Sequence, residues 1–155
     1  MRTSPRNPGG QRGTAMVEFM IGLPALLFLL FATAEIGRLI SQYNTLTKAV
    51  RDGVRYAASN AIPNGTGLIN ITPTVQTAVA NLVVTGSTAG TGSPLLPGFS
   101  TSNVAVTDAG GGYVSVSASY TYQPMIGATL PTFGLGNPIS LAITMNTAAL
   151  MPALL

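Results

Sequence analysis

The chain of 155 residues is long enough for one domain and an appended segment, and it is poor in charge: 7% of its residues are Asp, Glu, Lys or Arg, whereas 46% are hydrophobic. It contains no Cys and no His, so thiolate nucleophiles, imidazole bases and the usual ligands of zinc and haem are missing. We therefore expect neither a water-soluble monomer nor an enzyme, and we expect no metal site and no cofactor.

The net charge of +3 comes entirely from the first thirteen residues. That segment holds three arginines and no acidic residue, whereas the four basic and four acidic side chains of the remainder balance each other. After Arg55 the only charged side chain is Asp108. A nucleic-acid-binding surface needs clustered cations, so we expect no nucleic acid among the partners.

The amino-terminal region divides into a polar segment and an apolar one. Residues 1–13 are rich in Pro, Gly and Arg, which is typical of a leader or tail that does not pack. Residues 14–34 are almost wholly apolar and would rise about 31 Å as a helix, the thickness of a bilayer core. Glu18 is the one charge in this predicted transmembrane helix, and Pro24 is expected to kink it gently.

Residues 35–60 continue the helical pattern, but the apolar positions now fall on one side only. These positions are Ile36, Leu39, Ile40, Tyr43, Leu46, Val50, Val54 and Ala57. Lys48, Asp52 and Arg55 lie on the opposite side, which is typical of a solvated helix face. Pro and Gly residues between positions 60 and 67 are expected to end this amphipathic continuation of the helix.

Residues 61–155 are expected to form a small β-rich domain that opens with a short helix. Thr72 followed by Pro73 is typical of an N-cap with proline at the first helical position, and the helix is expected over residues 74–83. Residues 104–107 and the segment that begins at Tyr113 predict two strands joined by a Gly-rich turn.

The strand that begins at Tyr113 has the clearest alternation in the chain, with one apolar and one hydroxyl face. Residues 139–146 predict a third strand, with Ile139, Leu141, Ile143 and Met145 on one side. We expect the apolar face of this small antiparallel sheet to pack on the helical stripe of residues 36–57, which gives an α+β fold with a long amino-terminal helix.

Two ordinary interpretations of the amino-terminal region compete with a more specific one. A basic start, an apolar run and the sequence Ala32-Thr33-Ala34 before Glu35 fit a secretory signal peptide. In that case the mature chain would be a secreted binding protein or adhesin beginning at Glu35. An uncleaved signal anchor would equally explain the apolar span, but neither interpretation explains Gly13 and Glu18 together.

The sequence GTAMVEF at residues 13–19 resembles the processing site of type IV prepilins, in which a basic leader ends in Gly and Glu is the fifth residue of the mature chain. The longer sequence GTAMVEFMIGLPALLFLLFATAEIGRL, followed by AVRDGVRYAAS at residues 49–59, resembles the TadE-like family of tight-adherence (Tad, or Flp-type IV) pilus proteins. The resemblance covers roughly residues 10–60. It implies a pilin-like fold and cleavage by a prepilin peptidase between Gly13 and Thr14.

The resemblance also gives Glu18 a role in assembly. A carboxylate near the bilayer centre costs about 2.5–3.5 kcal/mol, and cleavage would create a compensating α-amino group on Thr14, either in the same chain or in a neighbouring subunit. The alternative is that Glu18 is merely an acid in the first turn of a helix, where the macrodipole favours it. Arg51, Asp52 and Arg55 match the second block of the family and are candidate subunit contacts, although a solvated helix face explains them as well.

Together these observations predict a minor pilin or pseudopilin of a Tad pilus that takes part in pilus assembly and surface adhesion. Its expected partners are the prepilin peptidase, other pilin subunits, the Tad pilus assembly machinery and the lipid of the bacterial inner membrane. Three arginines precede the span, so we expect a single pass with the carboxyl-terminal domain facing outward.

Overall fold

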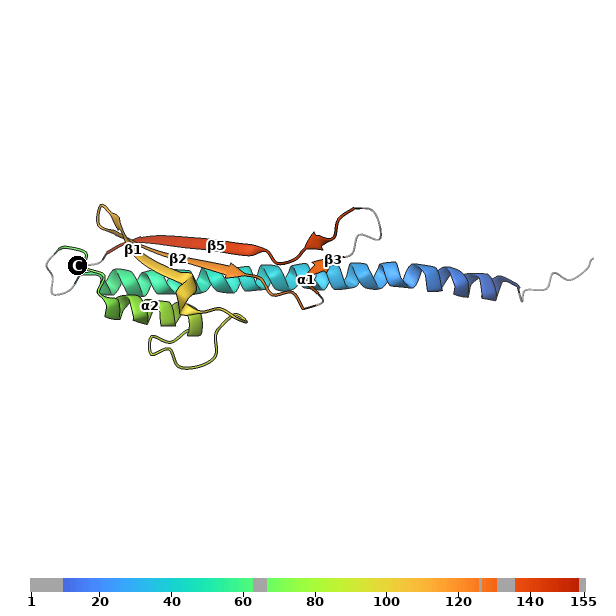
Figure 1. The fold of residues 1–155 in the computed structure, drawn as a ribbon, viewed down its shortest axis with the longest axis horizontal. Coiled ribbons are helices and arrows are strands. Elements are labelled where there is room, and N and C mark those ends of the chain that lie inside the picture. Colours follow the sequence, from blue (N-terminus) through green and yellow to red (C-terminus); the bar gives the residue numbers. More distant parts are fainter. Residues whose placement is uncertain (1–9, 63–66, 126, 131–135, 154–155) are drawn as a thin grey trace, which may run out of the picture. The chain divides into compact units, whose positions relative to one another are not determined.

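The computed structural model describes residues 10–62, 67–125, 127–130 and 136–153. Two helices, α1 (Gly10–Asn60) and α2 (Pro73–Thr85), precede a short 3-10 helix, η2 (Thr101–Asn103). Five strands follow: β1 (Val104–Gly110), β2 (Tyr113–Thr121), β3 (Thr129–Leu130), β4 (Ile139–Ser140) and β5 (Thr144–Pro152) (Figure 1). The predicted α+β class is confirmed. The chain divides within α1 into two compact units, Met1–Gly37 and Arg38–Leu155.

Helix α1 ends where the sequence predicted but begins earlier, at Gly10 rather than Thr14. Gln11 and Arg12 are good helix formers, so they extend the helix toward the amino terminus. Pro24 lies inside α1, and the bend expected there stays a prediction. Of the predicted leader, residues 1–9 lie outside the described residues, as do residues 63–66 of the predicted helix stop.

Helix α2 has the predicted cap. The Thr72 side chain accepts a hydrogen bond of 3.3 Å from the backbone N–H of Val75, and Pro73 occupies the first turn. The helix ends at Gly86, whose φ of 77° is the left-handed conformation that glycine adopts at helix ends. These two capping residues fix α2 at 13 residues, slightly longer than expected.

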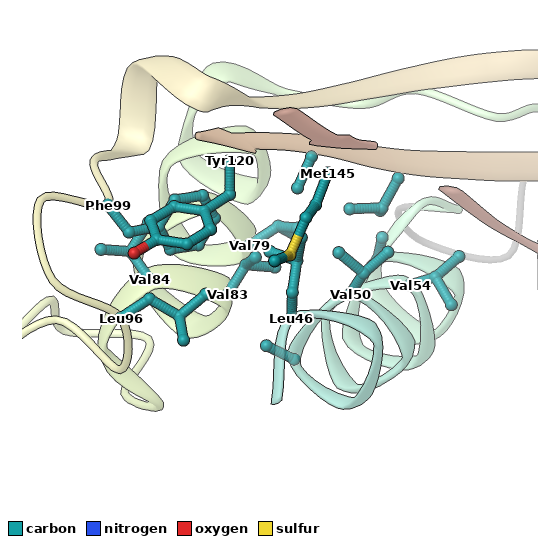
Figure 2. Close-up of a cluster of buried hydrophobic side chains, with 14 of the residues drawn as sticks. Leu46, Val50, Val54, Val79, Val83, Val84, Leu96, Phe99, Tyr120 and Met145 are labelled. Atoms are coloured by element: carbon teal, nitrogen blue, oxygen red, sulfur yellow. The ribbon is translucent and has the colours of Figure 1, made fainter. Parts of the chain in front are cut away.

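The main sheet has the antiparallel order β1-β2-β5, and β3 and β4 form a separate pair. In β2 the alternation predicted from the sequence is present, because Val114, Val116, Ala118 and Tyr120 are buried while the residues between them are half-buried. The inner face of the sheet packs on α1, where Leu46, Val50 and Val54 are buried. Figure 2 shows α1 and α2 side by side under the sheet.

The predicted packing stripe is confirmed from Leu46 onward and only in part before it. Ile36, Ile40 and Tyr43 are 43–56% exposed, whereas Leu39 is partly buried and packs against the core. From Leu46 onward every residue of the stripe is buried.

The predicted single strand over residues 139–146 is also wrong. The chain forms the short strand β4, turns, and begins β5 only at Thr144. The turn is local: the Ile143 N–H donates to the Leu141 carbonyl at 2.8 Å, which is the spacing of a three-residue turn. As a result Leu141 and Met145 are buried, whereas Ile139 and Ile143 are exposed.

Candidate functional site

The first part of α1 exposes a large apolar surface within the unit Met1–Gly37. Eleven of its large apolar side chains are between 37% and 75% exposed: Met16, Val17, Phe19, Met20, Ile21, Leu23, Leu26, Leu27, Leu29, Leu30 and Phe31. Among the described residues, Gly13–Asn60 is the one helix long and apolar enough to cross a membrane, and its apolar window contains no buried residue. This is the composition of a helix whose surroundings are lipid or other apolar helices.

Gly13, Thr14 and Glu18 lie together near the start of this helix, and all three are exposed. Thr14 and Glu18 are one helical turn apart and share a face. A Cβ atom added at Gly13 would meet no other atom within 4 Å. Packing therefore does not require glycine at this position. Glycine in a helix interior also costs about 1 kcal/mol relative to alanine.

A hollow of about 350 Å³ lies beside Glu18 on one face of the helix. It is lined by Ala15, Glu18, Phe19, Gly22 and Leu26, which recur at three- and four-residue spacing. Ala15 and Gly22 leave the space because their side chains are small. Neither residue was predicted from the sequence as part of a site, although the spacing of seven residues between two small side chains on one helix face was a signal for it.

The remaining predicted site residues have different surroundings. Pro24 is exposed in the interior of α1. Arg51, Asp52 and Arg55 belong to the unit Arg38–Leu155 and are exposed, away from the buried side chains of Val50 and Val54. They are therefore available for contacts with other molecules and take no part in the core, but nothing in the structure assigns them a partner.

A buried polar cluster in the unit Arg38–Leu155 was not predicted from the sequence. The Tyr120 hydroxyl lies 3.2 Å from Gln42 Oε1 and 3.0 Å from the Pro97 carbonyl oxygen, and can donate to either. Burial raises the pKa of Tyr120, and the charge of Arg38 and a backbone hydrogen bond with Gln123 partly offset this rise. Gln42 interrupts an apolar stripe, and this was the signal that a polar partner lay opposite it.

The first part of α1 is thus of the membrane type, and it carries the apolar surface, the small-residue hollow and the exposed Glu18. The folded α+β unit follows it in the sequence. Residues 13–55 match the model of a protein family described as TadE-like protein. The match lies within α1 and covers less than half of the chain, and it confirms the TadE-like resemblance of this segment. Searches of curated proteins and of solved structures gave no match.

The TadE-like match indicates a protein associated with a Tad pilus, and together with the apolar helix it indicates association with a membrane. Both the predicted cleavage site at Gly13 and Glu18 lie inside the matched segment, as do the three charged residues of the second block.

Proposed function

We propose that this chain is a minor pilin or pseudopilin of a Tad-type pilus, with a structural rather than a catalytic role. The observation that carries the proposal is the pair Gly13 and Glu18, which lie five positions apart at the start of a membrane-length apolar helix and inside the TadE-like match. A prepilin peptidase whose pocket admits only glycine would account for Gly13.

Cleavage after Gly13 by a prepilin peptidase would release residues 1–13 and give Thr14 a charged amino group. Glu18 is then a partner for that amino group, in the same helix or in an adjacent one. In an apolar environment an unpaired charge is strongly disfavoured. The hollow beside Glu18 offers a place where a neighbouring helix can approach the carboxylate closely, because Ala15 and Gly22 are small.

The α+β unit would face outward from the inner membrane and meet other subunits, and from there it would contribute to surface adhesion. This orientation rests on the excess of arginine before the span. The exposed Arg51, Asp52 and Arg55 are candidate contacts to other subunits in this proposal.

The rival function is a secreted binding protein cleaved before Glu35. One observation favours the pilin proposal over this rival. The TadE-like match runs from residue 13 to residue 55 and so continues through the supposed signal-peptide cleavage point before Glu35.

The proposal predicts that Glu18→Ala leaves cleavage and membrane insertion intact but abolishes surface piliation. Removal of the carboxylate makes the span more apolar, so insertion is not impaired. Loss of the partner for the Thr14 amino group should disfavour docking between helices by several kcal/mol where the pair is well buried. The measurement compares surface pili and co-purified pilus proteins in wild type and variant at equal membrane levels.

Two further variants sharpen this test. Glu18→Gln keeps the size of the side chain without the charge and should behave like Glu18→Ala, whereas Glu18→Asp keeps the charge and should retain part of the piliation. Normal piliation by Glu18→Ala would show that Glu18 is only a helix-start acid and would count against the pilin proposal.

A further inference from the structure

Strand β2 runs along α1 toward the end at which α1 enters the unit Arg38–Leu155. A Cβ atom added at Gly53 would lie 3.7 Å from Cγ1 of Val116, near the middle of β2. Four residues later in β2, the Tyr120 hydroxyl lies 3.2 Å from Oε1 of Gln42, which precedes Gly53 by three turns of α1. Strand β2 is therefore antiparallel to α1, and the chain leaves β2 at the amino-terminal end of this unit.

The chain between β2 and β5 lies beyond the sheet at this end. Thr121, the last residue of β2, pairs with Thr144, the first residue of β5. Just past them the Tyr122 N–H donates to the Ile143 carbonyl at 2.9 Å. Figure 1 shows β3, which pairs with β4, beyond the end of β2. The described residues here are 123–125, 127–130 and 136–143 and are termed the β2–β5 segment.

Three large apolar side chains of the β2–β5 segment are exposed: Met125 by 78%, Ile139 by 58% and Ile143 by 45%. Leu141, between the two isoleucines, is buried and holds the segment against the unit. The exposed apolar side chains therefore belong to a segment that is fixed by its backbone bonds at one end of the sheet.

Helix α1 also exposes apolar side chains at this end of the unit. Ile40 and Tyr43 are 53% and 43% exposed, and a spacing of three residues places them on one face. Arg38 is half-buried, and the exposed charged side chains of the unit begin only at Lys48. The change from apolar to charged exposed side chains on α1 therefore falls between Tyr43 and Lys48.

This change falls where α1 is expected to leave the bilayer. Ile40 follows Ala34, the last residue of the predicted span, by six residues, or about 9 Å of helix. The interfacial layer on each side of a bilayer is roughly 5–8 Å thick, and helical side chains lean toward the amino terminus. Ile40 can therefore reach this layer, and Tyr43 is a residue type enriched there.

We propose that the β2–β5 segment rests on the surface of the bilayer that α1 crosses, with Met125, Ile139 and Ile143 inserted among the lipid headgroups. The proposal rests on the membrane span and not on the pilin role. Insertion removes exposed apolar area from water, which is favourable in proportion to that area. The inserted side chains carry no charge, so the contact needs no anionic lipid.

Lipid is the occupant that the position of the segment favours. The segment leaves the sheet beside Gln42, eight residues after the predicted span. The span therefore keeps the bilayer surface within reach of the segment at a high effective concentration. A second copy or another protein would first have to meet the chain and then displace this lipid.

The first test places a label in the β2–β5 segment of the purified full chain. The chain has no Cys, so Met125→Cys, Ile139→Cys and Ile143→Cys can each carry one nitrobenzoxadiazole fluorophore. Each labelled chain is reconstituted at one copy per nanodisc of phosphatidylcholine, with or without lipid that carries a doxyl quencher at acyl carbon 5. Leu150→Cys is the control, because residue 150 is exposed on β5, six residues beyond Thr144.

We expect the quencher to lower the fluorescence about twofold or more at the three segment positions and to leave position 150 nearly unchanged. Replacing a third of the phosphatidylcholine by phosphatidylglycerol should not alter this result, because the inserted side chains are uncharged. Absence of quenching at the three positions, or quenching only with the anionic lipid, would overturn the proposal.

The second test separates insertion from mere closeness to the bilayer. Met125→Glu places a charge at a residue that is 78% exposed and outside any strand, so the fold is not affected. A carboxylate resists insertion, so we expect quenching of a label at position 139 to fall about twofold in this variant. Met125→Leu should retain the quenching, and Leu150→Glu, on the far part of β5, should not change it. Equal quenching in Met125→Glu and the parent chain would contradict insertion.

These outcomes are separable from those of the proposed function. A chain that keeps residues 1–13 but shows lipid quenching at the segment would refute the pilin proposal alone. A mature chain that begins at Thr14 and shows no quenching would refute the membrane contact alone.

Discussion

At Gly53 helix α1 has no room for a side chain. A Cβ atom added there would lie 2.5 Å from Cγ2 of Val83 on α2 and 3.7 Å from Cγ1 of Val116 on β2. Val83 is fully buried, and its branched side chain has few alternative rotamers. The glycine therefore permits the contact between the two helices and the sheet.

We expect Gly53→Ala to destabilise the chain even though alanine is the better helix former. The gain in helix propensity is about 1 kcal/mol, whereas overpacking a filled core costs about 1–3 kcal/mol. The melting temperature in detergent should fall by a few degrees. Gly37→Ala is the matched control, because a Cβ at Gly37 meets nothing within 4 Å, and it should not lower the melting temperature. Equal melting of Gly53→Ala and wild type would contradict the close packing.

Tyr120 links α1, the sheet and the loop at Pro97 through one hydroxyl. Its ring also meets Phe99 edge to face, with ring centroids 5.7 Å apart. Burial raises its pKa above the ordinary value of 10.0, so the folded chain holds the phenolic proton more tightly than the unfolded chain does.

This raised pKa predicts an alkaline loss of stability. The contribution of Tyr120 is fully present below pH 10 and is lost as the pH rises from 10 through the raised pKa, because the unfolded chain releases the proton first. Tyr120→Phe should remove this part of the pH dependence. It should also cost about 1–3 kcal/mol at neutral pH, since the Pro97 carbonyl and Gln42 lose a donor. Unfolding measured between pH 8 and 11 checks both effects, and identical pH profiles would contradict the first.

At the scale of the element, β2 is the central strand and carries the core. It pairs with β1 on one side and with β5 on the other, and Val114 and Val116 are fully buried. Because a one-residue shift would exchange its two faces, the alternation fixes the register of the sheet.

We therefore expect Val116→Asp to destabilise the fold by several kcal/mol, since it buries a carboxylate with no cation beside it. Ser117→Asp changes the adjacent residue on the opposite, half-buried face and should cost far less. Thermal melting of the two full-length variants in detergent distinguishes them. Similar melting temperatures would show that the two faces of β2 are not buried as described.

The elements predicted from the sequence are those with strong local signals. Helix α2 has its Thr72 cap and Pro73, and β2 has strict alternation, so both are visible within a few residues. The end of β5 was missed because residues 147–152 contain few β-branched or aromatic side chains. Its start was misplaced because a tight turn at Leu141 interrupts an alternating pattern.

The same distinction applies to the candidate sites. Gly13 and Glu18 form a local motif, so the sequence shows them directly. The hydrogen bond between Tyr120 and Gln42 joins residues 78 positions apart. Such a contact depends on the tertiary fold, and no local pattern predicts it.

At the scale of the whole molecule, one helix serves two different surroundings. Before Gly37 its large apolar side chains are exposed, and from Leu46 onward the helix contributes one wall of a buried core. The charges follow this division, because the arginine-rich start precedes the apolar part and the balanced charges lie mostly in the amphipathic part. The proposed function depends on which portion of this helix remains in the mature chain.

A variant at the proposed cleavage site provides the control for that question. Gly13→Arg leaves the fold unaffected, because position 13 is exposed and a Cβ there meets nothing within 4 Å. We expect it to block processing and to leave residues 1–13 attached.

Mass spectrometry of the amino terminus of the chain purified from its native membranes tests the proposed function most directly. We predict that the mature wild-type chain begins at Thr14 and that Gly13→Arg does not. A mature chain that begins at Glu35 would identify a cleaved signal peptide, and one that retains residues 1–13 would identify an uncleaved anchor. Either result would contradict processing by a prepilin peptidase and, with it, the pilin function.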